Sequence, residues 1–170
     1  MYAILHYYYA IIHNEGGYNL KNNDARLISH IRKDGRKKIT RIALEEQIPV
    51  TTLYDRLKSY EKKGIANHTT LLNWKRLGFE KKAHIQINAT NSERMKVEEH
   101  LLLQPFVNSL YRVGGVSEFL AECVFRTGLQ MQEFLESLNE LGADVTVFEE
   151  LQELRRETFL TEDEHFKGVC

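Results

Sequence analysis

The chain has 170 residues, of which 42% are hydrophobic, a length and composition that fit one large or two small soluble globular domains. Its two cysteines, Cys123 and Cys170, lie far apart in the sequence, which excludes a disulfide framework and a C-x-x-C metal site and indicates a reducing, cytoplasmic location. The longest apolar stretch, residues 2–12, is about half the ~20 residues of a membrane span and lacks the features of a secretion signal. We therefore predict neither membrane insertion nor secretion.

The net charge of −1 conceals an uneven distribution along the chain. Residues 19–82 contain 16 Lys+Arg and 7 Asp+Glu, a net charge of +9, whereas residues 83–170 contain 7 and 16, a net charge of −9. A compact segment this basic typically binds a polyanion, because each phosphate contact releases counterions. A solvated basic face is the alternative. Two domains with different roles explain the reversal of charge more simply than one domain does.

Residues 1–18 form an N-terminal extension whose Tyr/Ile run is compatible with an added helix, a dimer contact or an unusual start of the reading frame. The basic half then predicts three short helices, over residues 24–33, 41–47 and 50–62. Asn23 or Asp24 is expected to cap the first helix and Thr40 the second. Pro49 separates the second helix from the third, and Gly64 ends the third.

A short β pair is expected after the third helix, at residues 65–72, around Asn67-His68. The order of three helices and a small hairpin is that of a winged helix-turn-helix, which we assign to residues 19–79. In this motif the last helix enters the major groove of DNA with its N-terminal residues at the base edges.

The third helix carries the candidates for reading bases. Thr51, Thr52 and Tyr54 lie at its start, with Asp55 and Lys58 one turn further on, and hydroxyl groups can donate to or accept from several base edges. A solvated helix face is the competing interpretation. Phosphate contacts are assigned to residues in loops and at helix ends: Arg36, Lys37, Lys38, Thr40, Arg41, Lys62 and Lys63.

The acidic half predicts a different arrangement of elements. Strands are expected over residues 83–89, 107–113, 119–125 and 145–151, and helices over 93–102 and 129–141. The order βαββαβ is that of a ferredoxin-like domain, which we assign to residues 80–160, followed by a polar tail at 161–170. The predicted fold class is therefore α+β, with a winged helix-turn-helix followed by a ferredoxin-like domain.

Several short patterns resemble the leucine-responsive regulator/AsnC (Lrp/AsnC) family of prokaryotic transcription regulators. Leu20 and Asp24, Asp34-Gly35-Arg36, Ile42-Ala43, the run from Ile48 to Leu53, Arg56-Leu57, Gly64-Ile65 and Leu77-Gly78-Phe79 follow the family's order without a gap, although a serine is usual in place of Pro49. The resemblance spans about residues 20–157. It implies DNA binding by the first half, and in the second half dimerisation and, in many members, binding of an amino acid.

The family often has a Thr-Gly-x-x-Asp pattern between its second and third strands. Here that place holds Gly114, Gly115 and Glu118, which are our candidate effector-binding residues, with an ordinary hairpin turn as the alternative. The seven histidines show no pair at i+3 or i+4, and no phosphate loop or nucleophile motif is present. We therefore expect no metal, no cofactor and no enzymatic activity.

The sequence thus predicts a cytoplasmic transcription regulator that binds a pseudo-palindromic double-stranded DNA site. It would act as a homodimer or a larger even oligomer, open to modulation by a small molecule such as an amino acid. The main alternative is a small-molecule sensor or protein-interaction module with only residual DNA binding. A regulatory subunit of a biosynthetic enzyme is a third interpretation, but it leaves the charge of the basic half unexplained.

Overall fold

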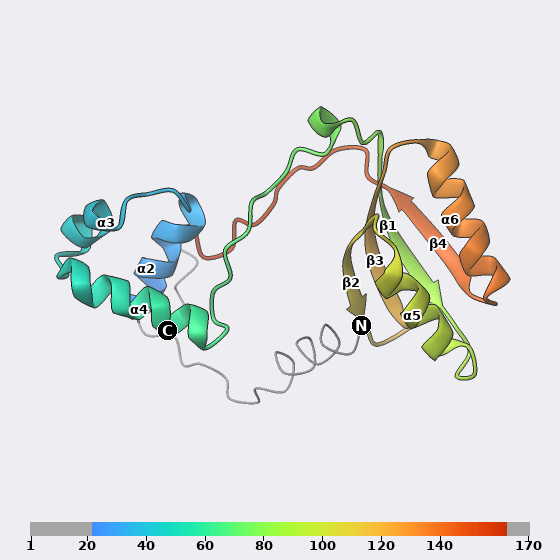
Figure 1. Ribbon diagram of the computed structural model, residues 1–170, viewed down its shortest axis with the longest axis horizontal. Helices are drawn as coiled ribbons and strands as arrows, with labels where there is room; N and C mark the ends of the chain where they lie inside the picture. Colours follow the sequence, from blue (N-terminus) through green and yellow to red (C-terminus); the bar gives the residue numbers. More distant parts are fainter. Residues whose placement is uncertain (1–21, 163–170) are drawn as a thin grey trace. The chain divides into compact units, whose positions relative to one another are not determined.

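The computed structural model describes residues 22–162, which form two compact units (Figure 1). The first unit contains the described residues up to Thr70 together with the segment that begins at Arg155, and the second unit is Leu71–Leu154. The boundaries expected from the sequence, after residues 79 and 160, differ from these, because two stretches without helical or strand periodicity gave no sign of which unit they would join. The expected extension at residues 1–18 and the last eight residues of the tail lie outside the described residues.

Three helices build the first unit: α2 (Asn22–Lys33), α3 (Ile39–Glu46) and α4 (Val50–Lys62). Their inward side chains form one apolar core, made of Leu27, Ile28, Ile42, Ala43, Leu53 and Tyr60. Helices this short are marginal alone, so the burial of these faces is what stabilises them. The predicted three-helix order is confirmed, and α4 has the predicted bounds. No helix within residues 22–162 has the length and apolar character needed to span a membrane.

Two helix caps expected from the sequence are wrong. Asn23 and Asp24 both lie inside α2, and Asp24 is buried and accepts a hydrogen bond of 2.5 Å from the Tyr60 hydroxyl. Thr40 lies within the first turn of α3, whose N-cap residue is Lys38 and has no side-chain capping bond. Both helices begin earlier than expected, so these residues, whose types are typical of caps, lie in the first turn instead. The carboxylate of Asp24 still interacts favourably there with the helix dipole.

The β pair expected at residues 65–72 is not formed. Gly64 ends α4 with a left-handed φ of 67°, as predicted, but the chain then continues without strand pairing to Asn73. The backbone amides of Ile65 and Ala66 donate to the Tyr60 carbonyl at 2.8 and 3.4 Å, and His68 pairs with Glu61 at 3.1 Å. Asn67-His68 provides no glycine for a tight hairpin turn, and an isolated pair of strands is marginally stable, so contacts with α4 replace the hairpin.

The second unit is a four-stranded sheet with two helices. After the short 3-10 helix η1 (Lys75–Leu77) its elements are, in order, β1 (Lys81–Asn88), α5 (Arg94–Leu103), β2 (Val107–Arg112), β3 (Phe119–Phe125), α6 (Gly128–Glu140) and β4 (Asp144–Glu149). The strand order is β2-β3-β1-β4, and every neighbouring pair is antiparallel. This arrangement confirms the predicted ferredoxin-like domain and, with the first unit, the α+β fold class.

The core of this unit lies between the sheet and its two helices. Alternate strand residues such as Ile85, Ile87 and Phe125 pack with Leu101 of α5 and Leu138 of α6. Because strand side chains alternate between faces, both helices must cover the same face of the sheet. The other face is left open. It carries exposed Tyr111 and Phe148 together with a charged cluster around Lys82.

Candidate nucleic-acid interface

The exposed side of α4 carries a polar stripe along its length. Thr51, Asp55, Lys58 and Lys62 recur at the spacing of one helix face, and all four are exposed. Leu53 and Tyr60 point to the core, which fixes the rotation of the helix. Thr52 and Tyr54 flank the stripe, and both are exposed. The structure therefore brings together, on one helix, all five residues expected to read bases.

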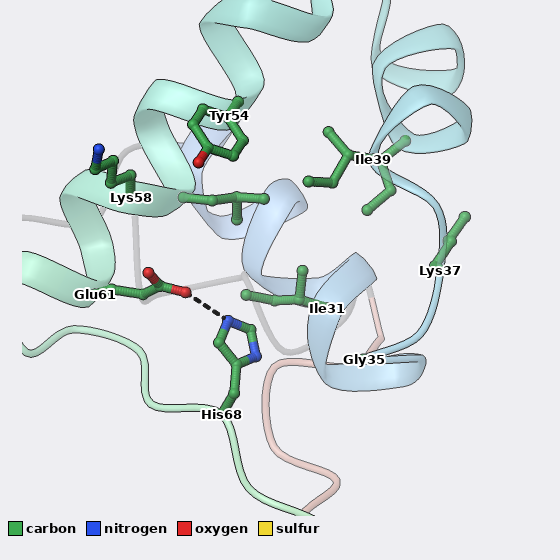
Figure 2. Close-up of a pocket in the computed structure, with 10 residues that line it drawn as sticks. Ile31, Gly35, Lys37, Ile39, Tyr54, Lys58, Glu61 and His68 are labelled. Carbon is green, nitrogen blue, oxygen red and sulfur yellow. Dashed lines mark ion pairs between the residues drawn. The ribbon is translucent and has the colours of Figure 1, made fainter.

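A hollow of about 320 Å³ lies beside this stripe (Figure 2). Its floor is apolar, and Tyr54 and Lys58 of α4 reach it from one side while the loop between α2 and α3 closes the other. Its lining residues are Ile31, Gly35, Lys37, Ile39, Ile42, Tyr54, Leu57, Lys58, Glu61 and His68. Tyr54 and Lys58 therefore border open space.

The basic loop expected to contact phosphate divides into two groups. Lys37 Nζ donates to Glu45 Oε2 at 2.5 Å and contacts His30 Nδ1 at 3.1 Å, while Arg41 Nε pairs with Glu45 Oε1 at 3.2 Å. Arg36 and Lys38 are exposed and form no ion pair with any residue between 22 and 162. Two of the expected phosphate ligands are thus already matched by a carboxylate, and two are not.

The remaining phosphate candidates are exposed. Thr40 lies in the first turn of α3, where backbone amides point outward, and Lys62 and Lys63 lie at the end of α4. Lys62 also belongs to the polar stripe, so it extends the surface of base-reading candidates toward the end of the helix.

A histidine network that the sequence did not reveal fastens α2 to α3. His30 Nε2 lies 2.7 Å from Glu46 Oε1, and Arg26 Nε lies 3.1 Å from Glu46 Oε2. With the Lys37 ammonium donating to Nδ1, the ring donates from Nε2 to Glu46, so both ring nitrogens are used. The two partners lie 16 residues apart on different helices, and no spacing rule relates them. The network holds the loop that carries the phosphate candidates.

The hydrogen bond from Lys37 lowers the pKa of the Glu45 carboxyl, and the bond from Arg41 acts in the same direction against partial burial. A carboxyl whose pKa is lower in the folded state stabilises the fold at neutral pH, and that contribution is lost as the pH falls through the folded pKa. We expect Lys37→Gln to raise the Glu45 pKa, as measured by NMR titration. Lys38→Gln, at the neighbouring position, removes the same charge without the hydrogen bond. An equal pKa shift in both variants would contradict the assigned pairing.

The effector candidates lie at the β2–β3 turn of the second unit. Gly115 has a left-handed φ of 110°, and a Cβ atom added at Gly114 or Gly115 would meet no atom of a more distant residue within 4 Å. Glu118 directly precedes β3, and its backbone amide donates to the Ile87 carbonyl at 3.2 Å. Its Oε1 lies 3.8 Å from Arg94 Nη1, whereas its buried Oε2 has no hydrogen-bond partner among the described residues. An unmatched buried acceptor is costly, so this carboxylate stands out as a site for a donor.

A second charged cluster, also missed from the sequence, lies on the open face of the sheet. Lys82 Nζ pairs with Glu150 at 2.9 Å, Glu122 at 3.3 Å and Glu153 at 3.7 Å, and only 15% of the lysine side chain is exposed. Burial alone would lower the Lys82 pKa, but the hydrogen bond from Lys82 to Glu150 and the other carboxylates raise it overall. The pairing across β1, β3 and the segment after β4 ties three parts of this face together.

The cysteine of the second unit lacks the chemistry of a reactive nucleophile. Burial raises the pKa of the Cys123 thiol to about 12, so the reactive thiolate is scarce at neutral pH. Between residues 22 and 162, no three His, Cys, Asp or Glu side chains come together as a metal site.

Comparisons with known proteins give the fold and its relatives. No family model matches the chain. It is 28% identical to an uncharacterised HTH-type transcriptional regulator of Pyrococcus furiosus, over 82% of this chain and 95% of that protein. A counterpart from Pyrococcus horikoshii is 26% identical over 82% of this chain and 95% of its own length.

Solved structures with the same fold include a leucine response regulatory protein and other transcriptional regulators. Mycobacterium tuberculosis LrpA superposes with a TM-score of 0.70 at 17% identity, over 81% of this chain and 97% of that chain. B. subtilis LrpC gives 0.73 at 16%, over 81% and 99%. A Neisseria meningitidis transcriptional regulator in complex with L-methionine gives 0.72 at 18%, over 81% and 93%. The resemblance drawn from the sequence motifs is therefore confirmed at the level of the fold.

Proposed function

We propose that this chain, which has the fold of the Lrp/AsnC regulators, is a transcription regulator that binds specific sites in double-stranded DNA. The observation that carries the proposal is the exposed polar stripe of α4, presented by a helix-turn-helix in the +9 half of the chain. The major groove of DNA is wide enough to admit an α-helix, and each base pair presents there a distinct pattern of donors, acceptors and methyl groups. In this arrangement Thr51, Thr52, Tyr54, Asp55 and Lys58 face base edges.

Phosphate contacts position such a helix without reading sequence. Arg36, Lys38, Thr40, Lys62 and Lys63 are proposed to contact the backbone directly. Lys37 and Arg41 are proposed to contribute less to phosphate binding, because both already pair with the single carboxylate of Glu45. Lys37 and Arg41 thus help to hold the shape of the loop, whereas the other cations supply most of the affinity for phosphate.

Lys38→Ala is expected to flatten the salt dependence of duplex binding by about 0.9 in the slope of log Kobs against log[salt], which is the contribution of one phosphate contact. Lys37→Ala is expected to change this slope less, because its ammonium is ion-paired in the free protein. The measurement is fluorescence anisotropy with a random duplex at several salt concentrations. An unchanged slope in the Lys38 variant would remove the phosphate assignment of the loop.

We further propose that two copies assemble through the open faces of their sheets. Tyr111 and Phe148 are 55% and 51% exposed there, an unusual exposure for aromatic side chains on a sheet. A twofold axis through such a contact makes the interface self-complementary, and it supplies two α4 helices for a pseudo-palindromic site. Larger even oligomers would form by the association of several such dimers.

The proposed place of action is the cytoplasm, where a prokaryotic chromosome lies, and no catalytic activity is proposed.

Glu118 is proposed to take part in binding a small effector such as an amino acid. The free Oε2 offers an acceptor for an ammonium group, and the glycines at 114 and 115 leave the turn open to a ligand. In calorimetry with a panel of amino acids, we expect at least one to bind and Glu118→Gln to weaken it about tenfold or more. Glu99→Gln, an exposed site on α5, serves as the control. Absence of heat with every amino acid would rule out this effector class.

A further inference from the structure

The segment Arg155–Glu162, which we name the strap, belongs to the first unit and lies against α2 (Figure 1). The hydroxyl of buried Ser29 donates to the Thr161 carbonyl at 3.0 Å, and Arg32 Nε donates to the Phe159 carbonyl at 2.7 Å. The strap is thus anchored to the helix by its backbone as well as by its side chains.

Two ion pairs place the acidic side chains of the strap on the basic end of α2. Arg32 Nη2 lies 2.9 Å from Glu157 Oε2, and Lys33 Nζ lies 3.5 Å from Glu162 Oε2. The carboxylate side chains are 58% and 65% exposed, so water and salt screen both pairs strongly. Weak, exposed pairs of this kind are readily exchanged for another anion.

The backbone of the strap depends on this docking. Glu157 and Leu160 have left-handed φ angles of 50° and 61°, a backbone conformation that residues other than glycine and asparagine rarely adopt. Such conformations persist only where surrounding contacts hold them. Loss of the contacts with Arg32 and Ser29 would therefore let the strap detach from α2.

We propose that Arg32 and Lys33 form a second phosphate-binding surface, and that the strap covers it, so that strap and duplex compete for the same two cations. The inference rests on the proposed DNA-binding function. Arg32 and Lys33 directly precede the loop from Asp34 to Lys38, so the surface extends the phosphate contacts already assigned to that loop. When the strap covers this surface, the carboxylates of Glu157 and Glu162 neutralise part of the charge of the basic half. This weakens sequence-independent binding, which depends on phosphate contacts alone, more than it weakens sequence-specific binding, which also gains from base contacts.

The test compares the full chain with Glu157→Gln/Glu162→Gln, using random duplex at several salt concentrations. The matched control is Glu133→Gln/Glu140→Gln, which removes two exposed carboxylates from α6 and changes the net charge equally. We expect the strap variant to bind random duplex about three- to tenfold more tightly at low salt, with a slope steeper by about 1 to 2, while the control shows neither change. Circular dichroism confirms that the helices are retained.

Equal binding by the strap variant and the control, or weaker binding by the strap variant, would overturn the competition and leave the strap as a structural tie. Wild-type protein that binds no duplex at all contradicts the proposed function itself, and the inference with it. The two failures are distinguishable, because the first is read from the difference between variants and the second from the unmodified chain.

Discussion

Replacing Leu53 by alanine is expected to lower the free energy of unfolding of the first unit by about 3 kcal/mol and to abolish duplex binding. Leu53 is fully buried and lies in the core where α4 meets α2 and α3. Truncation leaves a cavity in a small core, and the rotation of α4 that directs Thr51 and Asp55 outward depends on this contact. We therefore expect stability and binding to fall together.

Thr52→Ala provides the matched control, since it shortens the adjacent but exposed side chain of the same helix. Its effect on unfolding is expected to stay within about 0.5 kcal/mol, with binding to random duplex unchanged. Urea unfolding followed by circular dichroism, with anisotropy for binding, measures both quantities. A Leu53 variant as stable as the Thr52 variant would show that α4 is not held by this core.

The double substitution Thr51→Ala/Thr52→Ala is expected to cost about 2 kcal/mol on a selected binding site and almost nothing on random duplex. The two hydroxyls lie at the start of α4, the part of such a helix that reaches base edges, and neither is buried. Removing them deletes base contacts while the phosphate contacts remain, so the specificity ratio falls and the salt slope does not.

Thr69→Ala/Thr70→Ala is the control for this prediction, because these exposed threonines lie beyond α4. The ratio of affinities for selected and random duplex, measured by competition, is expected to fall about thirtyfold in the first double variant and to stay unchanged in the control. An equal loss on both duplexes would mean that Thr51 and Thr52 act on phosphate or on folding rather than on bases.

Local signals along the chain were sufficient to predict α4 and the ferredoxin-like order. Pro49 and Gly64 mark the ends of α4, and alternation or helical spacing of apolar residues marked the elements of the second unit. Thr51, Asp55 and Lys58 of the polar stripe followed from the same spacing, because a helix with a known inward face has a known outward one.

Features that depend on distant partners could not be predicted in this way. Asp24 had the sequence position of a cap, but its partner Tyr60 lies 36 residues away. Lys37, a predicted phosphate ligand, also pairs with Glu45, and neither this contact nor the two partners of His30 could be read from the sequence. The strap is a polar stretch without periodicity, so only the folded chain shows where it docks.

Selection of sites from a pool of random duplexes by the full-length protein tests the central claim most directly. We predict enrichment of a pseudo-palindromic sequence whose half-sites lie about 10 base pairs apart, or a multiple of that spacing, because a twofold dimer presents two α4 helices to successive major grooves. A pool that remains random after repeated selection at low salt would contradict the proposed sequence-specific binding.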